Sequence, residues 1–179
     1  PEAIREFVKS IGLNRQDITV PIESLYAINR KMIDFDSLRF YFVEDPVPLK
    51  IKGELEQKEI EIPVHPETPD KTRKVKIGSS IYISKKDFDK NKEKEVRLLH
   101  LFNVHLNDTS KITSVENKKI PKIQWVSENV LAKVLMPDGK WIKGLVELGV
   151  SKLKKGDIIQ FERFGFAKSL NINKPFSTN

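Results

Sequence analysis

The chain has 179 residues, 39% of them hydrophobic and 32% charged, a balance that argues against a disordered or membrane-embedded protein. The absence of cysteine excludes disulfides, thiolate zinc sites and cysteine nucleophiles, and it agrees with a reducing, cytoplasmic location. With 32 basic and 25 acidic residues the formal net charge is +7, so a polyanion is the first partner to consider and a membrane is not.

Residues 1–36 are predicted to form two short helices. Four apolar residues of the first share one helical face: Ile4, Phe7, Val8 and Ile11. Gly12 follows them, where a helix end favours a residue that tolerates positive φ. The second helix has apolar side chains at helical spacing through Leu25, Ile28 and Met32, with Pro21 near its start.

From about Ser37 onward the apolar period changes from 3.6 residues to 2, which predicts strands. The runs RFYFV, EIEIPV, KVKIG, SIYIS, EVRLL and IIQF are examples, and roughly ten such short strands are expected. Asp138-Gly139 in MPDGKW predicts a hairpin turn, whereas the charge run KKDFDKNKEKEVR is predicted to be a solvated loop. A mainly β fold of antiparallel barrels or sandwiches is therefore expected, with a loose polar tail over residues 171–179.

Motifs for catalysis are missing from the sequence. It has no Gly-rich phosphate loop, no G-x-S-x-G elbow and no H-E-x-x-H zinc helix. His65 precedes a proline in a turn-like stretch, and the alternation of a strand puts His100 and His105 on opposite faces. No pair of carboxylates stands inside an apolar run, where a raised pKa would be expected. We therefore predict a binding module with no catalytic residue, metal site or cofactor of its own.

The basic residues are better organised than the acidic ones. Four of them lie where a loop enters a strand: Lys71, Arg73, Lys74 and Lys76. Arg97 lies within a second strand, and Gln160 and Arg163 lie within a third. A guanidinium fork and a glutamine amide together can check the edge of an exposed base. Because Gln160 and Arg163 are three apart, they can share a pocket only across a bulge or the end of a strand; the alternative for any isolated arginine is a solvated charge.

Collinear motifs over essentially the whole chain resemble the glutamyl/glutaminyl-tRNA synthetase family, in its C-terminal anticodon-binding part. They are PEAIREFVKSIGLNRQDITV, DPVPLKI, IPVHPETP, EVRLLHLFNV, KIQWVS and GDIIQFERFGF. The resemblance is to the archaeal and eukaryotic type of the glutamyl branch and implies a proximal and a distal β-barrel. No class I signature of the HIGH or KMSKS kind is present. The resemblance thus implies a piece of a longer ligase, which would use ATP and magnesium in a domain preceding Pro1.

The resemblance also implies which side chains read the anticodon. Arg39, Gln160 and Arg163 correspond to contacts with the middle base, a uridine, and Arg97 to a contact with the first base. In the glutaminyl branch a second basic residue lies two positions after the one that corresponds to Arg97. This position is Leu99 here. The insertion that reads the third base in the glutaminyl branch is shortened here. The candidates for contacts with the third base or with phosphates are therefore Lys90, Lys92 and Lys94, together with Lys71, Arg73, Lys74 and Lys76.

The expected domain boundaries follow the same resemblance. Residues 1–36 would connect to the catalytic domain, residues 37–106 with 156–170 would form the proximal barrel, and residues 107–155 the distal barrel. The expected partner is tRNA(Glu), with tRNA(Gln) second. Two alternatives stay open: a glutaminyl-tRNA synthetase domain, and an appendage that docks other synthetases or translation factors.

Overall fold

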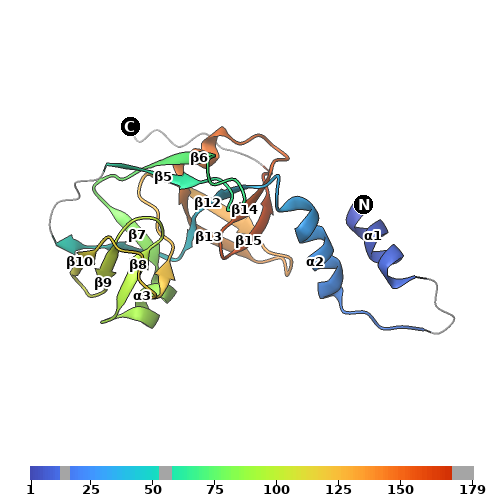
Figure 1. Ribbon diagram of the computed structural model, residues 1–179, viewed down its shortest axis with the longest axis horizontal. Helices are drawn as coiled ribbons and strands as arrows, with labels where there is room; N and C mark the ends of the chain where they lie inside the picture. Colours follow the sequence, from blue (N-terminus) through green and yellow to red (C-terminus); the bar gives the residue numbers. More distant parts are fainter. Residues whose placement is uncertain (13–16, 53–57, 171–179) are drawn as a thin grey trace.

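The computed structural model describes residues 1–12, 17–52 and 58–170 (Figure 1). Its helices are α1 (Glu2–Ile11), α2 (Ile22–Ile33), α3 (Lys85–Asn91) and a 3-10 helix η1 (Leu148–Lys152). The first seven strands are β1 (Leu38–Phe40), β2 (Phe42–Glu44), β3 (Pro46–Leu49), β4 (Ile51–Lys52), β5 (Glu59–Pro63), β6 (Thr72–Lys76) and β7 (Ile81–Ser84). The next four are β8 (Glu95–Leu98), β9 (Asn103–His105), β10 (Ser110–Ser114) and β11 (Lys122–Ile123). The last four are β12 (Asn129–Leu135), β13 (Trp141–Glu147), β14 (Ile158–Phe161) and β15 (Gly165–Lys168).

Both predicted N-terminal helices are confirmed. Gly12 ends α1 with φ 71°, and its N–H donates to the Val8 carbonyl at 3.2 Å. Pro21 precedes α2 in an extended conformation, and Arg30 and Lys31 lie in its last turn, where the helix dipole favours cations. The two helices lie side by side and apart from most of the β-structure (Figure 1). No helix in the described ranges is long and apolar enough to cross a membrane.

The strands enclose two hydrophobic cores, and the segment RFYFV lies between them. Phe40 and Phe42 pack into one core with Val146, Ile159 and Phe161. Tyr41 and Val43 point to the opposite side, into a larger core built around Trp125. Alternation along a strand produces this division, so a continuous apolar run is buried on both faces.

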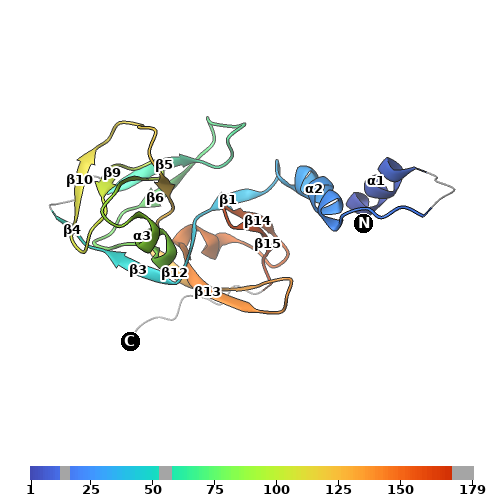
Figure 2. The same cartoon turned by 90° about the horizontal axis from the view of Figure 1, so that it is seen from below.

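We call the unit around Trp125 the outer lobe, comprising β3 to β11 and α3. The inner lobe comprises β1, β2 and β12 to β15, and it lies next to α2 (Figure 2). The inner lobe has two three-stranded sheets, in the orders β1-β14-β15 and β12-β13-β2. The outer lobe has a five-stranded sheet, β11-β8-β9-β10-β4, and the strand pairs β3-β7 and β5-β6.

Most strand pairs are antiparallel, and short parallel pairs join β1 to β14, β4 to β10 and β8 to β11. The predicted mainly β fold is confirmed, although the word barrel fits loosely because the sheets are not closed. The described ranges hold fifteen strands where about ten were predicted, in part because Tyr41 divides RFYFV into two strands of different sheets. The predicted domain boundaries stay a prediction; β10 and β11, beyond residue 106, pair with β9 and β8. The predicted tail lies outside the described residues.

Two local predictions had opposite outcomes. The MPDGKW turn is confirmed: Gly139 has φ 84°, and the Met136 N–H donates to the Lys140 carbonyl at 2.8 Å between β12 and β13. The solvated loop predicted for the charge run is wrong over Lys85–Asn91, which form α3. The Ser84 side chain caps this helix by accepting from the Asp87 N–H at 3.1 Å, and Phe88 packs against the outer core.

Gly144 on β13 is expected to tolerate no side chain. A Cβ atom there would lie 2.4 Å from the Val43 carbonyl oxygen and 2.6 Å from the Phe42 ring. Gly144→Ala should therefore lower the free energy of unfolding by about 1–3 kcal/mol or more, measured by urea denaturation. Gly78→Ala is the matched control, because its Cβ would meet the nearest atom at 3.6 Å, and equal losses for the two variants would contradict this prediction.

Candidate nucleic-acid interface

Arg39 and Gln160 lie directly opposite each other on adjacent strands. β1 runs parallel to β14, and Arg39 is the register partner of Gln160. The following pair, Phe40 and Phe161, packs into the inner core. Because successive side chains of a strand alternate between its faces, Arg39 and Gln160 project from the face opposite that core. The structure thus brings together two of the residues predicted to read the middle base.

Both of these side chains carry a buried polar atom without a hydrogen-bond partner. Among the described residues only three buried side-chain N or O atoms lack one: Arg39 Nε, Gln160 Oε1 and Tyr41 Oη. An unpaired buried donor or acceptor costs about 1–3 kcal/mol, so it calls for an explanation. Here an N–H donor and a carbonyl acceptor stand on neighbouring strands of one face. This arrangement suits a planar ligand edge that offers an acceptor next to a donor.

Arg163 lies beyond the end of β14, in the turn that leads into β15. Its φ of 59° is left-handed, which is uncommon outside glycine and is often found at functional positions. The expected strand end between Gln160 and Arg163 is therefore present. The guanidinium of Arg163 crosses to the outer lobe, where Nη1 donates to the Lys122 carbonyl at 2.5 Å.

Arg97 is fixed by the loop that follows β10. Its Nη1 lies 3.0 Å from Asn103 Oδ1, 3.0 Å from the Val115 carbonyl and 2.9 Å from the Glu116 carbonyl. Lys122 is its register partner across the parallel pair of β8 and β11. Arg97 and Arg163 therefore converge on Lys122, an exposed residue.

No motif in the sequence singles out Lys122 or connects it with His100. Burial lowers the pKa of His100, and the charges of Arg73, Arg97 and Lys122 add to this effect. His100 is therefore neutral at neutral pH, and its surroundings are rich in positive charge. Only the parallel pairing of β11 with β8 brings Lys122 to Arg97, so no local signal could have identified this group.

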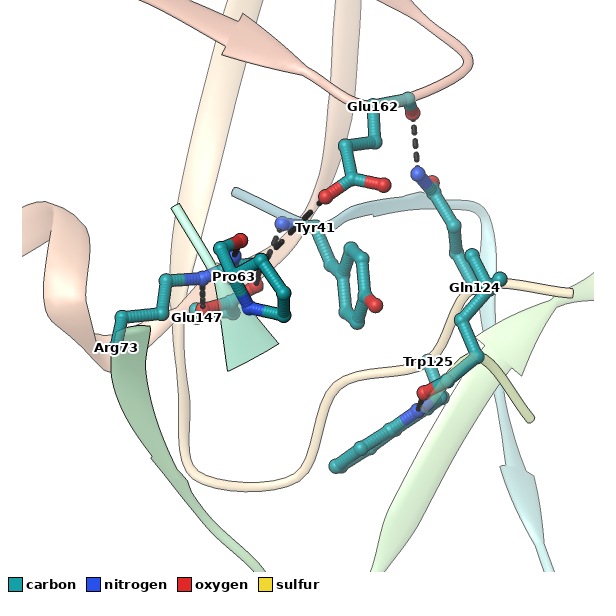
Figure 3. A network of polar contacts seen from close by, with 8 residues as sticks. Tyr41, Pro63, Arg73, Gln124, Trp125, Glu147 and Glu162 are labelled. Carbon is teal, nitrogen blue, oxygen red and sulfur yellow. Dashed lines mark hydrogen bonds and ion pairs between the residues drawn. The ribbon is translucent and has the colours of Figure 1, made fainter. Parts of the chain in front are cut away.

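Arg73 occupies the junction between the lobes (Figure 3). Its Nε and Nη2 donate to the two carboxylate oxygens of Glu147 at 3.0 and 2.8 Å, and Nη1 donates to the Pro63 carbonyl at 2.9 Å. The guanidinium carbon also lies 5.2 Å from the centre of the Tyr41 ring. Only 12% of the Arg73 side chain is exposed, so its donors serve the contact between β6 of the outer lobe and β13 of the inner lobe.

No single apolar run holds a pair of carboxylates, but the fold brings two acids from different runs to Arg73. Glu147 is buried, and Glu162 lies 3.8 Å from Arg73 Nη2. Burial raises the pKa of Glu162, while the positive charges of Arg73 and Arg39 act in the opposite direction. Each acid stands alone in its own apolar segment, and only the packing of the two lobes brings them to one guanidinium.

The turn that carries Arg163 is held by the outer lobe at a second point. The Gln124 side-chain amide donates to the Glu162 carbonyl, and the indole Nε1 of the neighbouring Trp125 donates to the Leu99 carbonyl at 2.9 Å (Figure 3). The Tyr41 N–H donates to Glu147 Oε1 at 2.7 Å. The turn from Glu162 to Phe164 is therefore supported by the outer lobe next to Lys122.

The candidate lysines lie on the outer lobe. All six are exposed: Lys71, Lys74, Lys76, Lys90, Lys92 and Lys94. Lys74 pairs with Glu59 at 3.4 Å and Lys92 with Asp108 at 2.9 Å. Exposed ion pairs of this kind contribute little to stability, so these charges remain available to a polyanion. In the part of the chain that the structure describes, His, Asp and Glu form no group of three or more that could hold a metal ion.

Two family models match this β-structure, and both are described as "tRNA synthetases class I (E and Q), anti-codon binding domain". They cover residues 37–123 and 90–169. The chain therefore belongs to the anticodon-binding domains of the class I tRNA synthetases for E and Q, which confirms the predicted resemblance.

Curated relatives point to the glutamate branch of this family. The chain is 38% identical over 186 residues to a glutamate–tRNA ligase of Thermococcus onnurineus and 40% identical over 185 residues to that of Pyrococcus abyssi, each alignment covering 94% of the chain. A glutamate–tRNA ligase of Nitrosopumilus maritimus is 35% identical over 206 residues and matches 100% of the chain. The chain spans only about a third of these relatives' length, 32% for the first two and 35% for the third.

Proposed function

We propose that this chain is the anticodon-binding part of a glutamate–tRNA ligase and that it reads the anticodon of tRNA(Glu). One observation carries the proposal: Arg39 Nε and Gln160 Oε1 are unpaired on directly opposite residues of one sheet face. The names of the relatives support the choice of glutamate. In the whole ligase, ATP, magnesium and the aminoacylation chemistry would belong to residues outside this chain, and we expect a cytoplasmic enzyme.

The donor and the acceptor match uridine as the middle base. Uracil presents an N3–H donor next to a carbonyl acceptor, so Gln160 Oε1 accepts the first and Arg39 Nε–H donates to the second. Cytosine presents an acceptor at N3 and an amino donor beside it, so both contacts would be repulsive. A base splayed out of its loop exposes this edge. The pocket for the middle base would be formed by Arg39 and Gln160 on β1 and β14, and both side chains must turn toward the base because these two atoms are buried in the free chain.

The other contacts follow from the two lobes. We assign Arg97 to the first base, because its contacts with residues 115–116 hold its guanidinium in place beside Lys122. Lys122 and the six exposed lysines of the outer lobe would neutralise phosphates or reach the third base. Arg73 is assigned to the lobe junction instead, since its donors already have partners.

The direct test is binding of the chain to anticodon stem-loops for glutamate, glutamine and an unrelated amino acid at two salt concentrations. We expect a preference for the glutamate loop that persists in higher salt, whereas a preference for the glutamine loop would favour the glutaminyl branch. Equal and weak binding of all three loops that vanishes with salt would contradict base readout, because it would show phosphate contacts alone.

Arg163→Ala is expected to weaken binding of the glutamate stem-loop by about 1–3 kcal/mol, because it removes a guanidinium from the turn that follows β14, the strand of Gln160. The left-handed φ of residue 163 makes a second variant necessary. Arg163→Asn tolerates that conformation better and should lose as much affinity as Arg163→Ala. Both should be measured by titration calorimetry; a loss confined to the alanine variant, or an equal loss for a scrambled loop, would contradict a contact with a base.

A second candidate function, protein docking, is favoured by the outer face of the β12–β13 hairpin. Leu131 and Trp141 are 69% and 57% exposed there, and Lys133 stands directly opposite Lys143. Exposed apolar groups beside like charges fit an acidic protein surface. Titration of the chain with purified synthetases and translation factors tests this candidate. Trp141→Ser should weaken such a complex and leave stem-loop binding unchanged.

A further inference from the structure

Arg39 is held from two directions by Asp34 and His65, to which the resemblance assigns no role. Its Nη2 donates to Asp34 Oδ1 at 3.1 Å and lies 3.2 Å from His65 Nε2. Asp34 is the C-cap residue of α2, and His65 follows β5 in the outer lobe. Only 6% of the His65 side chain and 16% of the Arg39 side chain are exposed. The guanidinium is therefore enclosed by a helix end and a loop of the other lobe.

The hydrogen bonds of the ring define how His65 acts. The Glu67 N–H donates to His65 Nδ1 at 3.1 Å, so this nitrogen carries a lone pair. In a neutral imidazole the proton then lies on Nε2, which is 3.5 Å from Asp34 Oδ2. A protonated Nε2 cannot accept from Arg39, so its N–H faces the Asp34 carboxylate. Arg39 donates to Oδ1 of Asp34, and His65 Nε2 lies 3.5 Å from Oδ2.

Other contacts keep this carboxylate and this ring in place. The Asp34 N–H donates to the Arg30 carbonyl at 3.0 Å, and the Ser37 N–H donates to the Asp34 carbonyl at 3.2 Å. The Phe35 ring packs edge-on against His65, with centroids 5.8 Å apart. Two backbone hydrogen bonds of Asp34 and the aromatic contact of His65 thus restrict these residues before a ligand binds.

We propose that Asp34 and His65 are positioning residues for base recognition by Arg39. Asp34 accepts from the Nη2 end of the guanidinium, and His65 lies against both Nη2 and the Asp34 carboxylate. The unpaired Nε–H is left beside Gln160. A long arginine side chain would otherwise lose its freedom only when the base binds, and ordering it beforehand favours binding. This inference rests on the proposed anticodon function, and it adds to it the residues that determine how sharply the middle base is read.

The test uses anticodon stem-loops that differ only in uridine or cytidine at the middle position. His65→Ala should reduce the preference for uridine about tenfold, the order of one lost hydrogen bond, while the affinity for the cytidine loop stays nearly constant. His65→Gln keeps an N–H donor near the position of Nε2 and should restore most of the preference. His105→Ala, at an exposed histidine of β9, is the matched control and should change nothing.

A double-mutant cycle separates positioning from a general structural role. On an Arg39→Ala background, His65→Ala and Asp34→Asn should have no further effect on the uridine preference, because they act through Arg39. Thermal unfolding of each variant shows that it is folded; should His65→Ala be unfolded, His65→Gln and Asp34→Asn carry the comparison. An unchanged preference in His65→Ala, or additive losses in the cycle, would overturn the positioning role. A wild-type chain without any uridine preference would instead refute the proposed anticodon function.

Discussion

Glu147→Ala is expected to lower the free energy of unfolding by about 3–5 kcal/mol, the cost of leaving a buried charge without its partner. The substitution removes both acceptors of the Arg73 fork and the acceptor of the Tyr41 N–H. Glu162 compensates only in part, because its oxygen lies 3.8 Å from Arg73 Nη2 and burial raises its pKa. The quantity to measure is the urea midpoint together with the slope of the transition, on the intact chain.

Two further variants test the physical reason for this loss. Glu147→Gln keeps an acceptor for the Tyr41 N–H and should lose less stability. The double variant Arg73→Met and Glu147→Leu removes both charges and should recover much of the loss, since a buried ion pair is often replaceable by apolar groups. Asp108→Ala breaks the exposed pair with Lys92 and serves as the control, with an expected cost below about 1 kcal/mol. Equal costs for Glu147→Ala and Asp108→Ala would show that the lobe junction does not depend on this ion pair.

Gln160→Leu is expected to abolish most of the discrimination between uridine and cytidine at the middle anticodon position, a loss of about 1–3 kcal/mol. Leucine has a similar volume but no acceptor, so N3–H of uridine would be buried without a partner. The dissociation constants of the two stem-loops should be measured at one salt concentration. Their ratio reports base readout, because the phosphate contacts are the same in both complexes.

The free energy of unfolding of Gln160→Leu is an independent test of the proposed pocket. Oε1 of Gln160 is buried and unpaired in the free chain, so replacing it with an apolar group should leave the free energy of unfolding unchanged or raise it. A gain in stability with a loss of discrimination is the signature of a site kept for its ligand. Lys133→Ala on the other sheet of the inner lobe is the control, and its uridine preference should be that of the wild type. Loss of stability together with full retention of discrimination in Gln160→Leu would contradict the pocket.

Several features followed from neighbouring residues alone. Gly12 ends a helix, Asp138-Gly139 forms a hairpin turn, and the alternation in RFYFV predicts a strand, because each depends on backbone preferences within a few residues. The run around Lys85 is different: its dense charge indicates a loop, but the Ser84 cap and the packing of Phe88 against the core stabilise a helix. The family was recognisable because its motifs occur in order along the chain.

Polar side chains from distant segments required the tertiary structure. Residues 39 and 160 become neighbours only through a parallel strand pair, and Arg73 meets Glu147 only where the lobes pack. The same packing turns Arg73, expected to bind phosphate, into a partner of buried carboxylates, and it adds Asp34 and His65 to Arg39. The pattern of neighbouring residues along the chain thus determines the helices, the turns and the type of fold. Burial and long-range pairing decide which polar atoms are satisfied within the protein and which remain for a base, because that depends on groups far apart in the sequence.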